Sequence, residues 1–436
     1  MSSSNKKIGL ITTTSLVVGN MIGAGIFILP ASLSTYGSIS LLGWVFTASG
    51  AIILAKIFSN LSKIIVNKSG GPYAYSKEGF GDFIGFLVAW GYWISTWISN
   101  AAIAIAIIGA LSFFFPILET NSFLAVSVGL SMIWFFTWIN SNGVRFSGKI
   151  QVITTVLKIL PLLFVIIFGL FFFSLDNFPK FNLTGESDFT TFSLVAALTL
   201  YAFLGLESAS IPAENIKNSS KTVPKATMLG TIISTCIYIL GTIVLFGILP
   251  TETLQNSPAP FAEAGEVIGG KYAGYFIAMG AAISGMGALN GWILILAQIP
   301  MAAAKDKMFP RIFKKENKNG VPFLGLIIGS VLTSAILLIN MSDGIVDQFE
   351  FVVNLTVLSC LVPYLFVSAS YIIVTIEKKL HLNKFFKTFI LGSLGFAYSL
   401  WAIFGSGPDV VFYGFLLLLL GIPFYALMQW NKTKNK

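Results

Sequence analysis

The chain contains 436 residues, of which 55% are hydrophobic and only 10% are charged, with a formal net charge of +9. Soluble domains carry about 25% charged residues, so this balance excludes an ordinary soluble enzyme. A membrane-spanning helix needs about 20 apolar residues and, with its loops and tilt, takes up roughly 35 residues of chain, which leaves room for about twelve spans and no separate soluble domain.

The predicted elements are twelve hydrophobic runs. In chain order they lie near residues 9–33, 39–65, 80–114, 122–140, 147–174, 190–211, 226–249, 272–304, 322–340, 347–376, 386–405 and 409–430. Every backbone polar group in lipid needs an internal partner, so we expect these runs to be helices rather than open strands. Glycines interrupt the first run and another run follows it directly, which argues against a cleavable signal peptide.

The basic residues gather on one side of the predicted membrane. If the N-terminus is cytoplasmic, nearly all of the 27 lysines and arginines fall in inner segments; Lys180 and Lys271 fall in outer loops, and Lys56 and Lys158 fall inside runs. This asymmetry predicts a multi-pass protein of the cytoplasmic membrane with both termini in the cytoplasm. It also explains the positive total charge without a nucleic-acid partner.

Two of the runs are interrupted at corresponding places. The first is broken at Gly19-Asn20-Met21-Ile22-Gly23-Ala24-Gly25 and the sixth around Gly205-Leu206-Glu207-Ser208. The first run enters from inside and the sixth from outside, so two five-span halves would have opposite orientations. Such paired interruptions indicate the central site of a transporter, although glycines can also simply allow close helix packing. The predicted units are 1–174, 175–378 and, for the last two helices and tail, 379–436.

The first interruption suggests how a zwitterion could be held without charged side chains. An unwound backbone at Gly23-Ala24-Gly25 would direct the amides of the following half-helix at an α-carboxylate. Carbonyls released from the preceding half-helix could accept hydrogen bonds from an ammonium group. We therefore predict that this stretch binds the head of an amino acid.

Two ionisable side chains fall within predicted spans. A carboxylate such as Glu207 costs roughly 3 kcal/mol at the membrane centre and is functional by default, which makes it a candidate proton carrier or sensor. Its alternative role is that of a hydrogen-bonded packing residue. Lys158 could place its ammonium where another transporter holds a sodium ion, or could lose and regain a proton, whereas the alternative is snorkelling to the membrane surface. Snorkelling is the favoured interpretation for Lys56, which lies nearer the end of its run.

The remaining chemistry excludes other classes of protein. The single histidine, His381, lies in a lysine-rich loop, and Cys236 and Cys360 lie in apolar runs where burial as packing residues is expected. No metal-ligand cluster and no cofactor site are predicted. The spans contain no Ser/His pair or aspartate pair, so we do not expect an enzyme. Interrupted helices also favour a binding site over the repeated pore residues of a channel.

Three motifs resemble those of a known superfamily. They are Gly19-Asn20-Met21-Ile22-Gly23-Ala24-Gly25-Ile26-Phe27, Gly70-Gly71-Pro72-Tyr73-Ala74-Tyr75 and Gly205-Leu206-Glu207-Ser208. With them the chain resembles the amino acid–polyamine–organocation (APC) transporter superfamily, and within it the bacterial arginine/agmatine antiporters. The resemblance implies an all-α integral membrane protein of twelve transmembrane helices, with a five-plus-five inverted repeat, broken first and sixth helices, alternating access and often a homodimer.

The resemblance also implies roles for individual residues. Met21, Ala24 and Gly25 match positions that hold the α-amine and carboxylate. Asn100, with Ser95, Thr96 and Thr356, matches the positions around the guanidinium. Trp292 matches the tryptophan that packs on the aliphatic part of the substrate. The candidate substrate-binding residues are Met21, Gly23, Ala24, Gly25, Ser95, Thr96, Asn100, Tyr201, Leu204, Trp292 and Thr356. The proton-coupling candidates are Glu207 and Lys158, and the gating candidates are Tyr92, Tyr201, Trp292 and Tyr364.

Three departures from the antiporter pattern leave two functions open. Ala24 stands where the antiporters have a serine, Tyr201 replaces their gating tryptophan, and Lys158 replaces a small apolar residue and resembles proton-coupled permeases of the same superfamily. One predicted function is exchange of a cationic amino acid such as arginine for its decarboxylated amine, agmatine. The alternative is proton-coupled uptake of a neutral amino acid or of a broad range of amino acids.

Overall fold

A computed structural model describes residues 7–23, 25–66, 68–339, 345–377, 382–405 and 407–434. These residues are almost entirely helical. Within the described ranges no β-strand forms, and the sole β-type pairing is an isolated parallel bridge between Ile8 and Ile216. The absence of strands follows from the lipid environment, where only helices and closed barrels satisfy all backbone hydrogen bonds.

The sixteen α-helices of the described residues follow one another along the chain. They are α1 (Leu10–Met21), α2 (Gly25–Tyr36), α3 (Ile39–Ile64), α4 (Pro72–Ser112), α5 (Ile117–Thr120), α6 (Ser122–Ser141), α7 (Val144–Gly169), α8 (Asp188–Tyr201), α9 (Ser219–Ile248), α10 (Thr251–Asn256), α11 (Pro260–Lys305), α12 (Phe323–Ile339), α13 (Ile345–Glu377), α14 (Leu382–Gly405), α15 (Pro408–Leu419) and α16 (Gly421–Lys434). Short 3₁₀ turns join some of them, including η4 (Ser208–Ser210) and η5 (Ala213–Asn215).

The predicted number of spans is confirmed. In the part of the chain that the structure describes, ten segments are long and apolar enough to cross a membrane. Helices α1 and α2 together make the first of them, and α15 with α16 supplies the last. The two shorter apolar helices, α8 and α12, supply the remaining spans. The chain is therefore a twelve-helix membrane protein whose first and sixth helices are broken.

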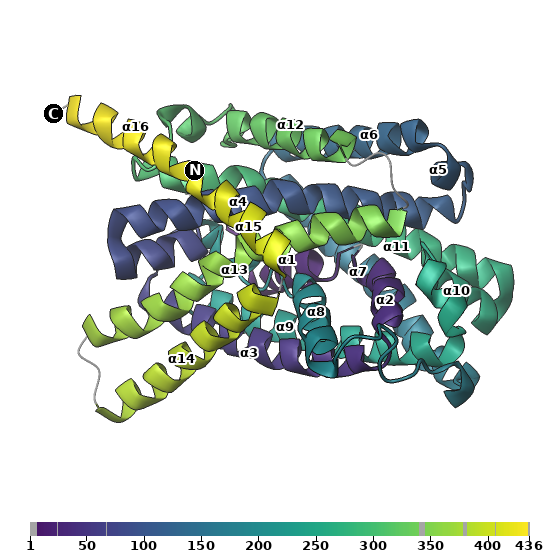
Figure 1. Ribbon diagram of the computed structural model, residues 1–436. Coiled ribbons are helices and arrows are strands. Elements are labelled where there is room, and N and C mark those ends of the chain that lie inside the picture. Colours follow the sequence, from purple (N-terminus) through teal and green to yellow (C-terminus); the bar gives the residue numbers. More distant parts are fainter. Residues whose placement is uncertain are drawn as a thin grey trace.

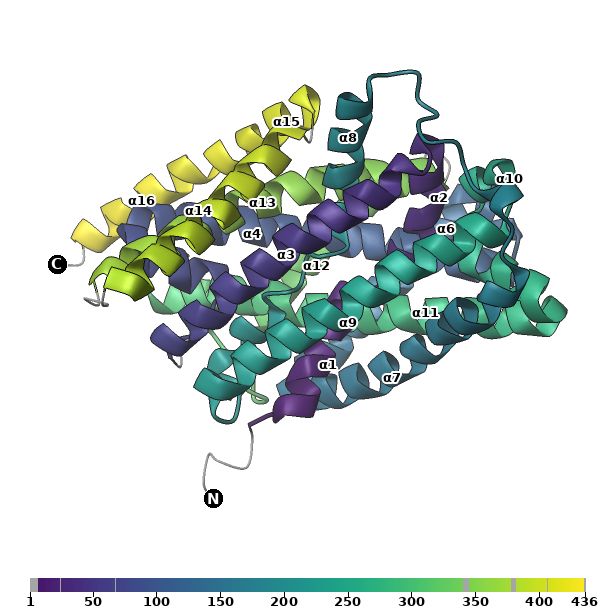
Figure 2. The same ribbon diagram turned by 90° about the horizontal axis from the view of Figure 1, so that it is seen from below.

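The bundle is arranged around α4 and α11. Helix α4 packs against α11 and α13, and α11 also packs against α7. Figure 2 shows α3, α9, α7 and α11 running nearly side by side, with α16 towards the left of the view and α10 towards the right. In Figure 1, α15 and α16 cross the face of the bundle that is nearest the viewer. They are the least buried span, whereas α4 and α11 are mostly buried.

The outward faces of the bundle are apolar, as lipid requires. Phe171 and Phe404, for example, are each 82% exposed. Cys360 is buried, which confirms its predicted role in packing, but the same prediction was wrong for Cys236, which lies exposed on α9. An apolar run in a membrane protein has a lipid-facing side as well as a core-facing side, and run composition alone does not separate them.

Part of the predicted organisation stays untested. The division into units 1–174, 175–378 and 379–436 stays a prediction. His381, and the boundary between the second and third of these units, lie outside the described residues.

Candidate substrate-binding site

The first broken helix opens at the predicted glycines. Helix α1 ends at Met21, and Ile22 leaves the helix with φ −76° and ψ 78°. The amide of Gly23 donates to the carbonyl of Met21 (2.8 Å) before α2 begins at Gly25. The last carbonyls of α1 thereby lose their helical partners and become available to other donors. Ala24, predicted to contact the substrate, lies outside the described residues.

The second broken helix opens after Tyr201. Turns follow α8 as far as η4, and Gly205 within them has φ +105°, a conformation that favours glycine. A Cβ at Gly205 would lie only 3.1 Å from the backbone of Asn20 and 3.2 Å from Cζ2 of Trp292. The second break therefore packs directly on the first and on α11.

Asn20 joins the three elements that meet at this point. Its Nδ2 donates to Oγ of Ser208 (2.9 Å), and its carbonyl accepts from Nε1 of Trp292 (3.1 Å). A Cβ at Gly291 would lie 2.0 Å from its Oδ1, so a larger residue there would displace the Asn20 side chain. The two broken helices and α11 thus form one hydrogen-bonded unit.

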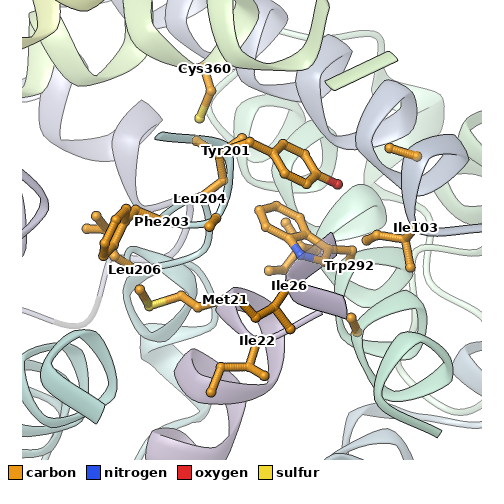
Figure 3. Packing of buried hydrophobic residues seen from close by; sticks show 14 of the residues in the cluster. Met21, Ile22, Ile26, Ile103, Tyr201, Phe203, Leu204, Leu206, Trp292 and Cys360 are labelled. Carbon is orange, nitrogen blue, oxygen red and sulfur yellow. The ribbon is translucent and has the colours of Figure 1, made fainter. Parts of the chain in front are cut away.

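A small buried cavity lies at this junction and contains about 330 Å³ of space not filled by atoms, part of it open to solvent. It is lined by Asn20, Met21, Gly23, Gly25, Ile26, Ser99, Ile103, Tyr201, Ala202, Leu204 and Trp292. Figure 3 shows the rings of Tyr201 and Trp292 beside each other above Ile26 at the start of α2. Apart from the phenol of Tyr201, the described lining holds no ionisable side chain, so the cavity offers mainly backbone dipoles and aromatic faces.

Six of the predicted substrate-binding residues line the cavity: Met21, Gly23, Gly25, Tyr201, Leu204 and Trp292. The four predicted guanidinium contacts do not. Three of those have hydroxyls bonded to their own helices, with Ser95 donating to the carbonyl of Tyr92, Thr96 to that of Trp93 and Thr356 to that of Val352. The fourth, Asn100, is fully buried, and neither atom of its amide has a partner among the described residues.

Sequence reasoning missed five lining residues: Asn20, Ile26, Ser99, Ile103 and Ala202. Asn20 and Ile26 lie inside the motif from Gly19 to Phe27, and their place in that motif could have identified them as lining residues. Ser99 and Ile103 are four apart on α4, so they share a face. Ser99 is also a hydrogen-bonding neighbour of Tyr201. The geometry of the second break, which brings Tyr201 to α4, was the missing information.

Lys158 is buried beside the first break. Its Nζ donates to the carbonyl of Gly19 (2.9 Å) and to that of Ile22, and it has no exposed surface. The hydroxyl of Ser284 on α11 also donates to the carbonyl of Ile22 (3.3 Å) and to that of Gly23 (3.2 Å). The ammonium thus occupies the end of α1, where the helix dipole is negative, rather than extending to the membrane surface. Lys56, in contrast, is exposed.

Glu207 is held between two predicted gate residues. The phenol of Tyr92 on α4 donates to one carboxylate oxygen, and that of Tyr364 on α13 donates to the other (2.6 Å). All three side chains are buried. The carboxylate therefore connects the second break to the two helices that pack beside it.

Within the described residues no group of three or more histidine, cysteine or acidic side chains could hold a metal. The site is built instead from two interrupted helices that meet at a buried cavity in an all-helical membrane bundle, which defines a secondary transporter.

A model of the amino acid permease family matches residues 8–433, and the chain belongs to this family, within the APC superfamily. It is 34% identical to the arginine/agmatine antiporter of Chlamydia pneumoniae, over all of this chain and 92% of the relative. It is 31% identical to the arginine/ornithine antiporter of Pseudomonas aeruginosa, over 97% of this chain and 91% of the relative. It is 32% identical to the putrescine transporter PotE of Escherichia coli K12, over 99% of this chain and 98% of the relative. The chain is thus an amino-acid or amine permease, in a family of transporters rather than enzymes.

Proposed function

We propose that this permease exchanges a cationic amino acid such as arginine for its decarboxylated amine, agmatine, by alternating access across the cytoplasmic membrane. Decarboxylation in the cytoplasm consumes a proton, so each cycle of exchange removes one proton equivalent from the cell. The relatives named above support a cationic substrate, because arginine, agmatine, ornithine and putrescine all carry a basic side group or a second amine.

The observation that carries the proposal is the chemistry of the cavity. Its floor is the interrupted backbone of α1 and α2, where carbonyls and amides complement the α-amine and carboxylate of an amino acid. Its walls include the rings of Trp292 and Tyr201, which attract a cationic side chain without a charged partner. A substrate with both a zwitterionic head and a cationic tail uses both features.

Lys158 favours a second candidate, proton-coupled uptake of a neutral amino acid or of a broad range of amino acids. Its ammonium lies on the carbonyls of Gly19 and Ile22, directly beside the cavity-lining residue Gly23. Loss of its proton would break the charge-assisted contact that holds the end of α1. Such a group could couple proton movement to a change in the first broken helix.

Flux in proteoliposomes separates the two candidates. Vesicles loaded with agmatine, with arginine or with buffer alone are given labelled arginine outside, with and without a pH gradient. Exchange predicts uptake only into vesicles that contain a countersubstrate. Uptake into buffer-loaded vesicles driven by the pH gradient would support the second candidate and contradict the first.

Two tryptophan variants test the role of the cavity walls. We expect Trp292→Ala to weaken arginine binding by about tenfold, which corresponds to losing about 1.4 kcal/mol of cation–π attraction and packing. Trp134→Ala is the matched control, because Trp134 lies on α6 and is 39% exposed. Equal arginine affinity in both variants would contradict the proposed site.

A further inference from the structure

A row of polar side chains runs along one face of α7. Ser147, Gln151, Thr155 and Lys158 are spaced by four, four and three residues, so they share a helical face. At most 4% of each side chain is exposed. This face is covered by α1 and α11, which lie against α7 in Figure 2. The row therefore lies inside the bundle and not on its lipid surface.

Amide side chains from the neighbouring helices extend this row. Asn290 of α11 accepts from Ser147 (3.3 Å) and donates towards Oε1 of Gln151 (3.5 Å). Asn140, near the end of α6, donates to Oδ1 of Asn290 (3.1 Å). We call these residues, together with Asn20, the amide seam: Asn20, Asn140, Ser147, Gln151, Thr155 and Asn290.

The seam contains polar atoms that lack hydrogen-bond partners. Among the described residues nothing pairs with Oδ1 of Asn20, Nε2 of Gln151 or Oδ1 of Asn140, although each residue is at most 3% exposed. Buried polar groups are nearly always bonded to protein or to ordered water, and an unpaired one costs about 1–3 kcal/mol. Buried donors and acceptors without a protein partner are the usual partners of a buried water.

Two glycines make room at the point where the seam meets the first broken helix. A Cβ at Gly19 would lie 1.8 Å from Nε2 of Gln151, and a Cβ at Gly291 would lie 2.0 Å from Oδ1 of Asn20 and 2.9 Å from Oε1 of Gln151. The carbonyl of Gly19 also accepts from Lys158. Two of the unpaired atoms, Nε2 of Gln151 and Oδ1 of Asn20, thus lie beside the first broken helix, where Lys158 also donates.

The other end of the seam lies close to the surface. Helix α6 ends at Ser141, one residue after Asn140, and the next residue, Asn142, is exposed. Exposed Asn319 donates to the carbonyl of Ser141 (3.2 Å). The seam therefore reaches from the buried lysine to the end of the bundle where α6 ends and α7 begins.

We propose that the amide seam holds ordered water and conducts protons between Lys158 and this end of the bundle. This inference rests on the second candidate function. The Lys158 ammonium gives one N–H proton to the nearest water and keeps the electron pair as a neutral amine. Each water then passes one proton to the next until a proton leaves at the end of the bundle where α6 ends and α7 begins. The reverse sequence returns a proton to the lysine. Within the described ranges the Lys158 ammonium forms no ion pair, and its hydrogen bonds go to the carbonyls of Gly19 and Ile22.

The water itself is tested by an experimental map at a resolution that shows ordered solvent. We expect density at hydrogen-bond distance, about 2.7–3.2 Å, from Nε2 of Gln151 and from Oδ1 of Asn20. A dry seam, with these amides turned to new protein partners, would overturn the proposal whether or not the protein transports arginine.

Proton conduction is tested in proteoliposomes that report substrate uptake and internal pH at once. Gln151→Leu keeps the size of the side chain but removes its amide, and we expect proton movement to slow by about tenfold, a barrier about 1.4 kcal/mol higher, with substrate binding at equilibrium unchanged. Gln151→Asn keeps an amide and leaves space for another water, so it should retain proton movement. Thr47→Val, which removes a buried hydroxyl bonded to Thr199 elsewhere in the bundle, is the matched control.

The outcomes distinguish this inference from the proposed function. Substrate exchange with no proton movement in the unaltered protein would overturn the seam's role and leave the exchange intact. Equal proton movement in the unaltered protein and in Gln151→Leu would also overturn it. Absence of any amino-acid or amine flux would instead overturn the proposed function.

Discussion

Among single residues, Glu207 is the one whose replacement has the clearest predicted effect on transport. Both of its oxygens accept from phenols, of Tyr92 and Tyr364, that belong to different helices. Glutamine preserves the shape but does not titrate, and its NH₂ group donates where the carboxylate accepted. We expect Glu207→Gln to fold and to transport at a rate that no longer varies with pH.

The measurement is the pH profile of substrate exchange in proteoliposomes. Tyr364→Phe serves as the control, because it removes one donor and leaves the carboxyl group in place, so a response to pH should persist. An unchanged profile in Glu207→Gln would assign Glu207 to packing alone.

Gly205 gives a second prediction at this scale. Its φ of +105° is strained for any residue with a side chain, and a Cβ would lie in tight contact, 3.1 Å from Asn20 and 3.2 Å from Trp292. A non-glycine residue held in such a backbone region costs on the order of 1–3 kcal/mol. We expect Gly205→Ala to lower the thermal stability in detergent and to weaken substrate binding.

Gly9→Ala is the matched control for this change, because nothing lies within 4 Å of a Cβ at Gly9 and its φ is −95°. A melting temperature and a substrate affinity for Gly205→Ala equal to those of the control would show that the two breaks do not pack as described.

At the scale of elements, a charged cluster joins the start of α4 to the end of α11. The carboxylate of Asp306 accepts from Lys77 (2.7 Å) and from the phenol of Tyr73 (2.7 Å). Partial burial acts to raise the pKa of Asp306, but the hydrogen bonds from Lys77 and Tyr73 outweigh it and hold the pKa below its ordinary value. Because the pKa is lower in the folded state, the cluster stabilises the protein above about pH 4, and this contribution is lost as the pH falls through the folded pKa.

The prediction concerns Asp306→Asn, measured by thermal unfolding in detergent. Near neutral pH we expect the variant to be less stable by at most about 1 kcal/mol, as for other partly exposed ion pairs. Well below pH 4 the variant and the unaltered protein should have the same melting temperature. A stability difference that is the same at both pH values would contradict the assignment.

The elements also show how far sequence reasoning extends. Two glycine-containing motifs predicted both broken helices, because interruption of an apolar run is a local property of the sequence. The position of Asn100 relative to the cavity was not predictable in the same way. Its amide is buried without a described partner, while its neighbour Ser99 lines the cavity. Which of two adjacent residues on α4 faces the cavity depends on how α4 rotates against α8 and α13, and no local pattern fixes that rotation.

For the whole molecule, length and composition predicted about twelve helices. The paired interruptions indicated a transporter, and the resemblance of three motifs indicated its superfamily. The amide seam was not predicted, although Ser147, Gln151, Thr155 and Lys158 are visible as a polar face in the sequence. The seam also needs Asn20 and Asn290, and only the packing of α1 and α11 against α7 brings these two residues to Gln151. The cytoplasmic position of both termini and the homodimer stay predictions.

The central claim is that the two broken helices together form the substrate site. Its most direct test is an experimental structure of the transporter with bound arginine. The account predicts the α-amine and carboxylate at the break between α1 and α2, beside Gly23 and Gly25, with the side chain between Tyr201 and Trp292. Arginine bound elsewhere in the bundle, with this cavity empty, would contradict it.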